Sequence, residues 1–271
     1  MWNEVIDEIS NKVPEADSVY LGEDGLKYCS VCHKRVQRMV TFMGITKKVN
    51  CRCDCFVKEQ EAIKERERRE EADRKRKVCF AKTNMAAWTF ENDDRQHPRI
   101  SDAMQNYASQ FKDFKRDGKG LILHGPTGTG KTYLAACVAN RLIDDGYRCY
   151  MTNFSEVINR MQEKFDGRQE FIEGLNDYSL LIIDDLGIER GTEYVLEIVF
   201  NIIDSRYRAG LPFIITTNRT MEQLKNPESV EYARIYERIL ERCFPIKVDG
   251  VSRRRQSVKD SYYDIKEKLG L

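Results

Sequence analysis

The chain has 271 residues, a formal net charge of +1 and 33% charged residues. This length allows one full domain and a smaller appendage, and the balanced charge singles out no class of partner. No apolar run approaches the roughly 18 residues of a membrane span. Residues 1–8 are acidic where a signal peptide is basic. The composition therefore argues against a membrane or exported protein, and we expect a cytoplasmic one.

The first 57 residues hold five of the nine cysteines, namely Cys29, Cys32, Cys51, Cys53 and Cys55. Close thiolate pairs separated by a loop suit tetrahedral zinc, and so short a segment has little core of its own. Four ligands suffice, and we expect Cys29, Cys32 and Cys51, with Cys53 or Cys55 as the fourth. Reduced thiols without metal are the alternative. The segment also contains C-x-x-C-H, the motif of c-type haem attachment, but no export signal accompanies it. Residues 1–57 thus predict a zinc-binding module.

Residues 58–77 are almost wholly charged and contain neither glycine nor proline. Acidic and basic residues alternate at spacings of three and four, which favours a solvated helix. We interpret residues 58–80 as a helical linker between two domains. Its basic end, residues 74–77, is also a candidate for contact with nucleic acid.

A glycine-rich loop follows the short apolar strand predicted at residues 120–124. The pattern G-x-x-x-x-G-K-T is typical of a loop that wraps around the phosphates of a nucleoside triphosphate and leads into a helix N-terminus. Lys131 would reach the β and γ phosphates, and the Thr132 hydroxyl would hold Mg²⁺. The expected ATP-binding residues are Gly125, Pro126, Thr127, Gly128, Thr129, Gly130, Lys131, Thr132 and Tyr133.

Short apolar strands alternate with amphipathic helices from about residue 79 onward, so we expect an α/β domain over residues 81–271 with a mostly parallel sheet covered by helices. The predicted strands are residues 120–124, 148–153, 180–184, 213–217 and 244–248. Ser155 is expected to cap a helix that runs to residue 165, and Thr192 one that runs through residue 207.

Two of these strands end in polar side chains. Asp184 and Asp185 follow a buried strand about fifty residues after the loop, and Asn218 follows another. Because the carboxyl ends of parallel strands share one edge of the sheet, these groups should meet at the phosphate loop. Asp184 would hold Mg²⁺, Asp185 would orient or deprotonate the attacking water, and Asn218 would place that water against the γ-phosphate.

Arginines recur at a spacing of four in the helical segment that contains Arg234, Arg238 and Arg242. An arginine supplied by a neighbouring subunit raises the rate of such reactions by about 10³ to 10⁵. The alternative is pairing with Glu237 and Glu241 on a wet surface. A second cluster, residues 253–255, is expected to sense the γ-phosphate from the same subunit or to contact nucleic acid.

With these elements in order, residues 89–254 resemble the DnaC/DnaI-type helicase loaders and the similar IstB-type transposition helpers, within the AAA+ ATPases. The matching segments are residues 120–132, 180–189, 215–218, 234–238 and 250–254. The resemblance implies that Asn218 is the sensor 1 residue and Arg254 sensor 2. It also implies that Arg238 is the trans arginine finger, with Arg234 as the substitute. Only 17 residues follow Arg254, so we expect a reduced lid.

The resemblance implies an ATP-dependent loader that places a replicative hexameric DNA helicase on single-stranded DNA, with ATP, Mg²⁺ and Zn²⁺ as cofactors. It further implies self-association into an ATP-dependent oligomer and a zinc module that contacts the helicase. Two other functions stay open. One is an IstB-like helper that binds DNA and recruits a transposase, and the other is a non-catalytic adaptor switched by nucleotide.

Overall fold

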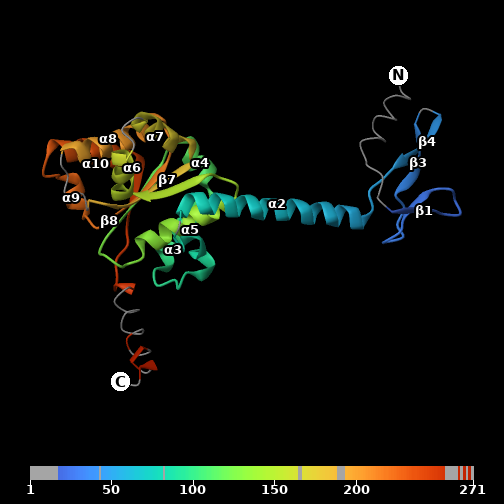
Figure 1. Cartoon of the computed structure of the whole chain (residues 1–271), viewed down its shortest axis with the longest axis horizontal. Coiled ribbons are helices and arrows are strands. Elements are labelled where there is room, and N and C mark those ends of the chain that lie inside the picture. Colours follow the sequence, from blue (N-terminus) through green and yellow to red (C-terminus); the bar gives the residue numbers. More distant parts are fainter. Residues whose placement is uncertain are drawn as a thin grey trace. The chain divides into compact units, whose positions relative to one another are not determined.

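The computed structural model describes residues 18–42, 44–81, 83–163, 167–187 and 193–253, together with residues 262, 265, 266, 268 and 269 (Figure 1). The chain divides into two compact units, Met1–Glu71 and Ala72–Leu271, and this division falls inside the helix that follows the cysteine cluster. Within the described residues, no helix is both long enough and apolar enough to cross a bilayer.

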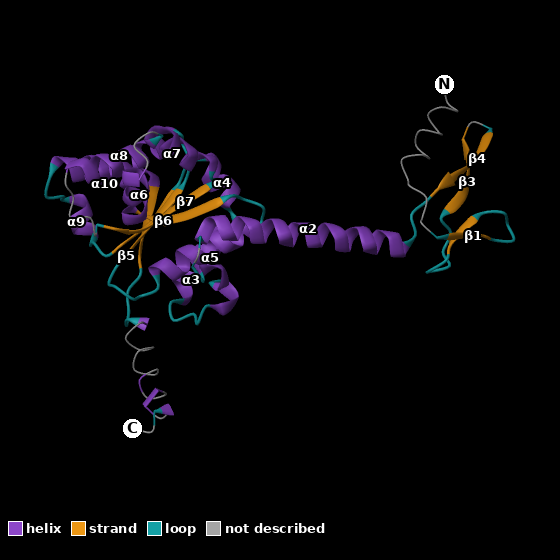
Figure 2. Cartoon of the chain, in the orientation of Figure 1, coloured by secondary structure: helices purple, strands orange, loops and turns teal. Residues whose placement is uncertain are grey.

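The first unit contains two small antiparallel hairpins (Figure 2). Their strands are β1 (Val19–Leu21), β2 (Lys27–Cys29), β3 (Gln37–Phe42) and β4 (Ile45–Asn50). Only a few apolar side chains are buried among the described residues, and they centre on Cys29, Val36 and Cys53. Because paired strands of this size are marginally stable in water, this unit needs more than its own hydrophobic packing.

Helix α2 (Asp54–Phe80) confirms the helix predicted over residues 58–77 and extends it at both ends. Ion pairs at a spacing of four support it, as between Arg66 and Glu70 at 2.9 Å. Its last turns carry buried side chains, including Cys79 and Phe80, which pack into the core of the second unit. Local ion pairs therefore stabilise the charged part of the helix, whereas packing against the core holds its C-terminal end.

The second unit is built on a five-stranded parallel sheet with the order β6-β7-β8-β5-β9. The strands are β5 (Gly120–His124), β6 (Cys149–Asn153), β7 (Leu180–Leu186), β8 (Phe213–Thr217) and β9 (Cys243–Lys247). All five predicted strands are confirmed within one or two residues of their expected ends. Strand β8 lies between β5 and β7, so the strand with the paired aspartates is not the direct neighbour of the strand before the phosphate loop.

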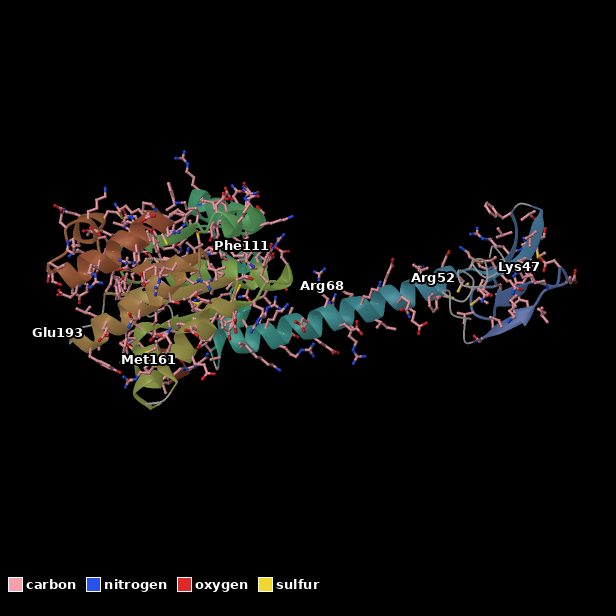
Figure 3. All side chains as sticks on the ribbon, turned by 90° about the horizontal axis from the view of Figure 1, so that it is seen from above. Lys47, Arg52, Arg68, Phe111, Met161 and Glu193 are labelled. Atoms are coloured by element: carbon pink, nitrogen blue, oxygen red, sulfur yellow. The ribbon has the colours of Figure 1, made fainter. Side chains whose placement is uncertain are left out.

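Helices cover both faces of this sheet (Figure 2). They are α3 (Pro98–Ser109), α4 (Phe111–Arg116), α5 (Lys131–Asp144), α6 (Phe154–Glu163), α7 (Arg168–Gly174), α8 (Glu193–Arg208), α9 (Met221–Lys225) and α10 (Val230–Arg242). Successive strand residues point to opposite faces, so Ile182 belongs to the cluster under α3 and α5, and Ile183 to the cluster under α6, α8 and α10. Figure 3 labels one member of each cluster, Phe111 and Met161.

One helix begins differently from the prediction. Helix α6 starts at Phe154, and the side-chain oxygen of Asn153 accepts a hydrogen bond from the Glu156 N–H at 2.8 Å. Asn153 therefore caps the helix, and the expected cap at Ser155 was wrong, because the strand before it delivers an equally good capping residue two positions earlier. The expected cap Thr192 lies outside the described residues, as does almost all of the expected reduced lid after Arg254.

Candidate functional site

The phosphate loop connects β5 to α5 and is crossed by the chain that follows β9. Gly125 and Gly128 have φ angles of +143° and +86°. A Cβ atom on Gly125 would lie 2.2 Å from the Val248 carbonyl oxygen, and one on Gly128 would lie 2.2 Å from the Ser252 hydroxyl. The Arg253 N–H also donates to the Gly128 carbonyl at 2.9 Å. Both glycines are thus required by backbone conformation and by close approach.

Lys131 is buried at the start of α5, and its ammonium group lies at the centre of the loop. It donates to the carbonyl oxygens of Gly125 and Pro126 at 2.8 and 2.7 Å, and to Asn218 Oδ1 at 2.8 Å. Asn218 follows β8, the direct neighbour of β5. The structure therefore brings together two of the predicted residues, from the segments that follow two neighbouring strands.

Asp184 meets Thr132 across the width of β8. The Thr132 hydroxyl donates to Asp184 Oδ2 at 3.1 Å. Burial raises the pKa of the Asp184 carboxyl, while the hydrogen bond from Thr216 acts in the opposite direction. A hydroxyl and a carboxylate beside a phosphate loop are the oxygen ligands that Mg²⁺ takes together with nucleotide phosphates, so these residues fit that ion.

Asp185 has an uncommon backbone conformation for a residue with a side chain, with φ at +58°. The pairing of β7 with β8 shifts at this point, because three steps from Ile183 to Leu186 match two steps from Ile215 to Thr217. Such a bulge re-aims the side chains beside it. Asp185 accordingly lines the cleft at the phosphate loop rather than continuing the inward and outward alternation of the strand.

This cleft has a volume of about 500 Å³. It is lined by Trp88, Thr127, Gly128, Gly130, Lys131, Thr132, Tyr133, Asp185, Asn218 and Arg253. A larger cavity of about 660 Å³ lies along β9, but it holds none of the predicted catalytic residues and is mostly apolar. The chemistry of the side chains therefore places the candidate site in the smaller cleft.

Sequence reasoning missed Trp88, which lies 5.7 Å from Tyr133 between ring centres. Its segment is tied to α5 because the Asn140 amide donates to the carbonyls of Met85 and Trp88 at 3.0 and 2.9 Å. No motif marks Trp88, and only the tertiary contacts bring it to the phosphate loop.

Of the basic cluster at residues 253–255, Arg253 lies in the cleft. Its guanidinium pairs with Asp94 at 2.8 Å and lies 5.9 Å from the Tyr133 ring centre. Arg254, the expected sensor 2 residue, lies outside the described residues. Arg253 is therefore in position to face a bound nucleotide.

The arginines of α10 lie away from the cleft and against α8. Arg238 donates to Asp204 at 2.8 Å, and its guanidinium lies 4.6 Å from the Phe200 ring centre. Arg234 is exposed and lies 4.3 Å from the same ring. The carboxylate that pairs with Arg238 comes from α8, whereas the sequence suggested Glu237 or Glu241 of the same helix as partners. The two candidates for the finger thus differ in how firmly their own subunit holds them.

The cysteine cluster consists of four thiols that lie within 4.8 Å of one another, those of Cys29, Cys32, Cys53 and Cys55. Hydrogen bonds from the backbone N–H groups of Cys32 and Val31 lower the pKa of the Cys29 thiol to about 6. The sulfur of Cys53, 3.0 Å away, raises the pKa of the Cys55 thiol. Four convergent sulfurs are the donor set of a closed tetrahedral zinc site, so these residues fit that ion.

The structure differs from the prediction at Cys51, which is not one of these four residues. Its N–H donates to the Val36 carbonyl at 2.8 Å, and its sulfur lies 3.5 Å from the Arg35 carbonyl oxygen. Cys51 therefore continues the pairing of β4 with the chain before β3. Both Cys53 and Cys55 join the cluster instead, because the chain turns into α2 directly after this pairing ends.

Fold and site together define a P-loop nucleotide-binding protein of the AAA+ type. The family described as IstB-like ATP binding protein matches residues 45–261, and the chain belongs to that family.

The chain is also similar to the replicative helicase loader DnaI of Bacillus subtilis (strain 168), with 27% identity over 192 residues, 66% of this chain and 62% of that protein. A putative insertion sequence ATP-binding protein of Sinorhizobium fredii is 25% identical over 171 residues, 60% of this chain and 56% of that protein. A crystal structure of DnaI superposes with a TM-score of 0.54 and 28% identity, covering 66% of this chain and 99% of that one. The match thus spans about six tenths of the length of these curated relatives.

Proposed function

We propose that the chain hydrolyses ATP in the cleft at the phosphate loop. The observation that carries this proposal is the convergence of Lys131 with Asn218 and of Thr132 with Asp184. Two of these side chains come from the start of α5, one from β7 and one from the residue after β8. Lys131 and the loop N–H groups would bind the phosphates. Thr132 and Asp184 would hold Mg²⁺, which neutralises developing charge when bound. Asp185 would orient or deprotonate the attacking water, and Asn218 would position it.

Two variants test these roles. We expect Lys131→Ala to abolish ATP binding, because the loop loses the cation that reaches the phosphates. Asp185→Asn should keep binding and lose turnover, because the amide cannot take up a proton. Binding is measured with a fluorescent ATP analogue and turnover by phosphate release. The exposed residues Lys112 and Asp117 supply matched controls, Lys112→Ala and Asp117→Asn. Equal loss of binding in Lys131→Ala and Asp185→Asn would contradict the assigned roles.

We infer that this ATPase loads a replicative helicase onto single-stranded DNA in the cytoplasm, working as an ATP-dependent assembly of several copies. Two observations support the inference. A relative that matches two thirds of the chain is named a replicative helicase loader. The chain also carries a separate cysteine module, Met1–Glu71, outside the nucleotide-binding unit. In this proposal the cysteine module binds zinc and contacts the helicase.

Affinity capture of the tagged full chain from its native cell extract with ATP tests this proposal. We expect a ring helicase to be retained and identified by mass spectrometry. Deletion of residues 1–57, or the double variant Cys29→Ser/Cys53→Ser, should release it, while the matched variant Cys51→Ser should retain it, because Cys51 lies outside the cluster of four thiols. Retention of the helicase by both altered chains would contradict the role of the module.

A transposition helper is the second candidate, since an insertion sequence ATP-binding protein is also among the relatives. It predicts a preference for duplex DNA over single-stranded DNA and recovery of a transposase in the same capture experiment. The third candidate, a non-catalytic adaptor, predicts very slow ATP hydrolysis that DNA does not change. Capture and turnover together therefore separate the three functions.

A further inference from the structure

Thr216 lies between the two acidic residues of the candidate site. Its hydroxyl donates to Asp184 Oδ1 at 2.6 Å, and it accepts a hydrogen bond from the Asp185 N–H at 2.9 Å. The side chain is fully buried near the end of β8, with an exposed fraction of 0%. A single hydroxyl thus contacts both acidic residues of the neighbouring strand β7.

The direction of these hydrogen bonds is fixed by the chemistry of the groups. A threonine hydroxyl has one proton, and a backbone N–H can only donate. Thr216 must therefore accept from Asp185, and its proton goes to the carboxylate of Asp184. Because Thr216 occupies Oδ1, the other oxygen of that carboxylate, Oδ2, is directed to Thr132 at 3.1 Å.

The contact with Asp185 stabilises a conformation that the residue would otherwise avoid. A φ angle of +58° is costly for a residue with a Cβ atom. The register shift between β7 and β8 also interrupts the regular ladder at this residue. The Thr216 oxygen supplies the acceptor for the Asp185 N–H there. It thereby holds the backbone in the turn that aims the Asp185 side chain into the cleft.

We propose that Thr216 is a positioning residue that orients both carboxylates, so that Asp184 presents Oδ2 to the Thr132 side of a metal ion and Asp185 faces the attacking water. This assignment rests on the proposed ATP hydrolysis. Residues that hydrogen-bond a metal-binding carboxylate typically change metal affinity or activity by about 10- to 100-fold when they are removed.

The next residue along β8 provides a matched control. Thr217 is also fully buried, and its hydroxyl donates to the Leu186 carbonyl at 2.6 Å and accepts from the Arg219 N–H at 3.1 Å. Both of these hydrogen bonds are to backbone groups, and neither involves a carboxylate. Removal of either hydroxyl leaves buried polar groups without a partner, so both variants should lose stability.

The experiment compares Thr216→Val, Thr216→Ser and Thr217→Val in the full chain. The first readout is the Mg²⁺ concentration that gives half-maximal binding of a non-hydrolysable fluorescent ATP analogue, and the second is kcat. We expect Thr216→Val to raise that Mg²⁺ concentration and to lower kcat, with a change of about 10- to 100-fold in at least one of them. Thr216→Ser, which keeps the hydroxyl, should restore most of both. Thr217→Val should change thermal stability with little effect on either readout.

Two results would overturn the proposal. One is an equal effect of Thr216→Val and Thr217→Val on the Mg²⁺ dependence and on kcat, which would assign Thr216 a purely structural role. The other is ATP binding by the unaltered chain that does not depend on Mg²⁺. If the unaltered chain binds ATP with Mg²⁺ but fails to hydrolyse it, the proposed ATPase function fails, while the binding measurement still decides the contact between Thr216 and Asp184.

Discussion

The two units of this chain hold their candidate sites in different ways. In the second unit, strands buried on both faces, with residues such as Ile182 and Ile214 fully buried, bring polar side chains together at one edge of the sheet. In the first unit, two of the candidate ligands, Cys29 and Cys53, are themselves part of the small core, while Met39 and Phe42 of the hairpin are about half exposed. Hydrophobic packing therefore supports the site at the phosphate loop, whereas the cysteine site must itself supply much of the stability of its unit.

Metal removal should produce the largest difference between the units. We expect zinc binding to contribute about 10–16 kcal/mol to folding of the cysteine module. Cys53→Ser should therefore lose bound zinc and the dispersed amide NMR signals of residues 18–53, while the melting of the nucleotide-binding unit stays the same. Zinc content is measured by atomic absorption. Cys51→Ser is the control and should keep its zinc, and loss of zinc from that variant would contradict the cluster of four described above.

Arg206 is a buried charged residue that stabilises the nucleotide-binding unit. Its guanidinium is fully buried and donates to the carbonyl oxygens of Leu175, Ser179 and Pro212. Burial lowers the pKa of Arg206 to about 10. Arg206→Met leaves three carbonyls without this donor, and we expect the free energy of unfolding to fall by about 3–5 kcal/mol in urea denaturation.

Arg208 lies on the same helix and provides the control. It is exposed and pairs with Asp204 at 3.0 Å. We expect Arg208→Met to change the free energy of unfolding by less than about 1 kcal/mol, because exposed ion pairs contribute little. Equal destabilisation by the two variants would contradict the structural role of the buried arginine.

Glycine substitutions test how far ATP binding depends on the backbone conformation of the phosphate loop. Gly125→Ala combines a left-handed φ angle with a clash against the Val248 carbonyl. Gly146 also has a left-handed φ angle, +91°, but an added Cβ meets nothing within 4 Å. We expect Gly146→Ala to cost about 1–2 kcal/mol of stability, and Gly125→Ala to cost more and to abolish ATP binding. Denaturation midpoints and ATP titrations check both, and unchanged binding in Gly125→Ala would contradict this account.

Much of the second unit was predictable from local sequence patterns. Apolar runs marked the five strands, and parallel pairing then required that their polar ends meet. The contacts of Lys131 with Asn218 and of Thr132 with Asp184 agree with that expectation. The site's finer geometry was not predictable, because the bulge at Asp185 depends on how β7 pairs with β8. Trp88 likewise reaches the cleft only through tertiary contacts, whereas the basic cluster that contains Arg253 was expected to face the γ-phosphate or nucleic acid.

The cysteine ligands show the same limit in the first unit. Spacing alone predicted a site with Cys51 as one of its ligands. The thiols that converge are decided by where the strand pairing ends and where α2 begins, and neither boundary has a sharp sequence signal here. Sequence patterns thus predict which elements form, while the choice among neighbouring residues depends on how those elements meet.

The smallest expected effect on stability separates the two candidates for the arginine finger. Arg238→Ala removes an ion pair with Asp204 and a contact with Phe200, so we expect a loss of about 1 kcal/mol. Arg234 is exposed and lies 4.3 Å from the same ring, so we expect Arg234→Ala to cost less, about 0.5 kcal/mol. Because an arginine that acts on a neighbouring subunit must be able to leave its own, exposure favours Arg234 over the sequence-based choice of Arg238.

Mixing experiments decide between them. A finger variant should be inactive alone and regain ATPase activity when mixed with Asp185→Asn, since each subunit then supplies what the other lacks. We expect this rescue for Arg234→Ala, with only a small change in thermal stability. Rescue of Arg238→Ala instead would support the sequence-based assignment and would mean that its pairing with Asp204 is exchanged for the neighbour's nucleotide. Absence of rescue for both variants at saturating protein would exclude Arg234 and Arg238, the two arginines of α10 that lie against Phe200, as the finger.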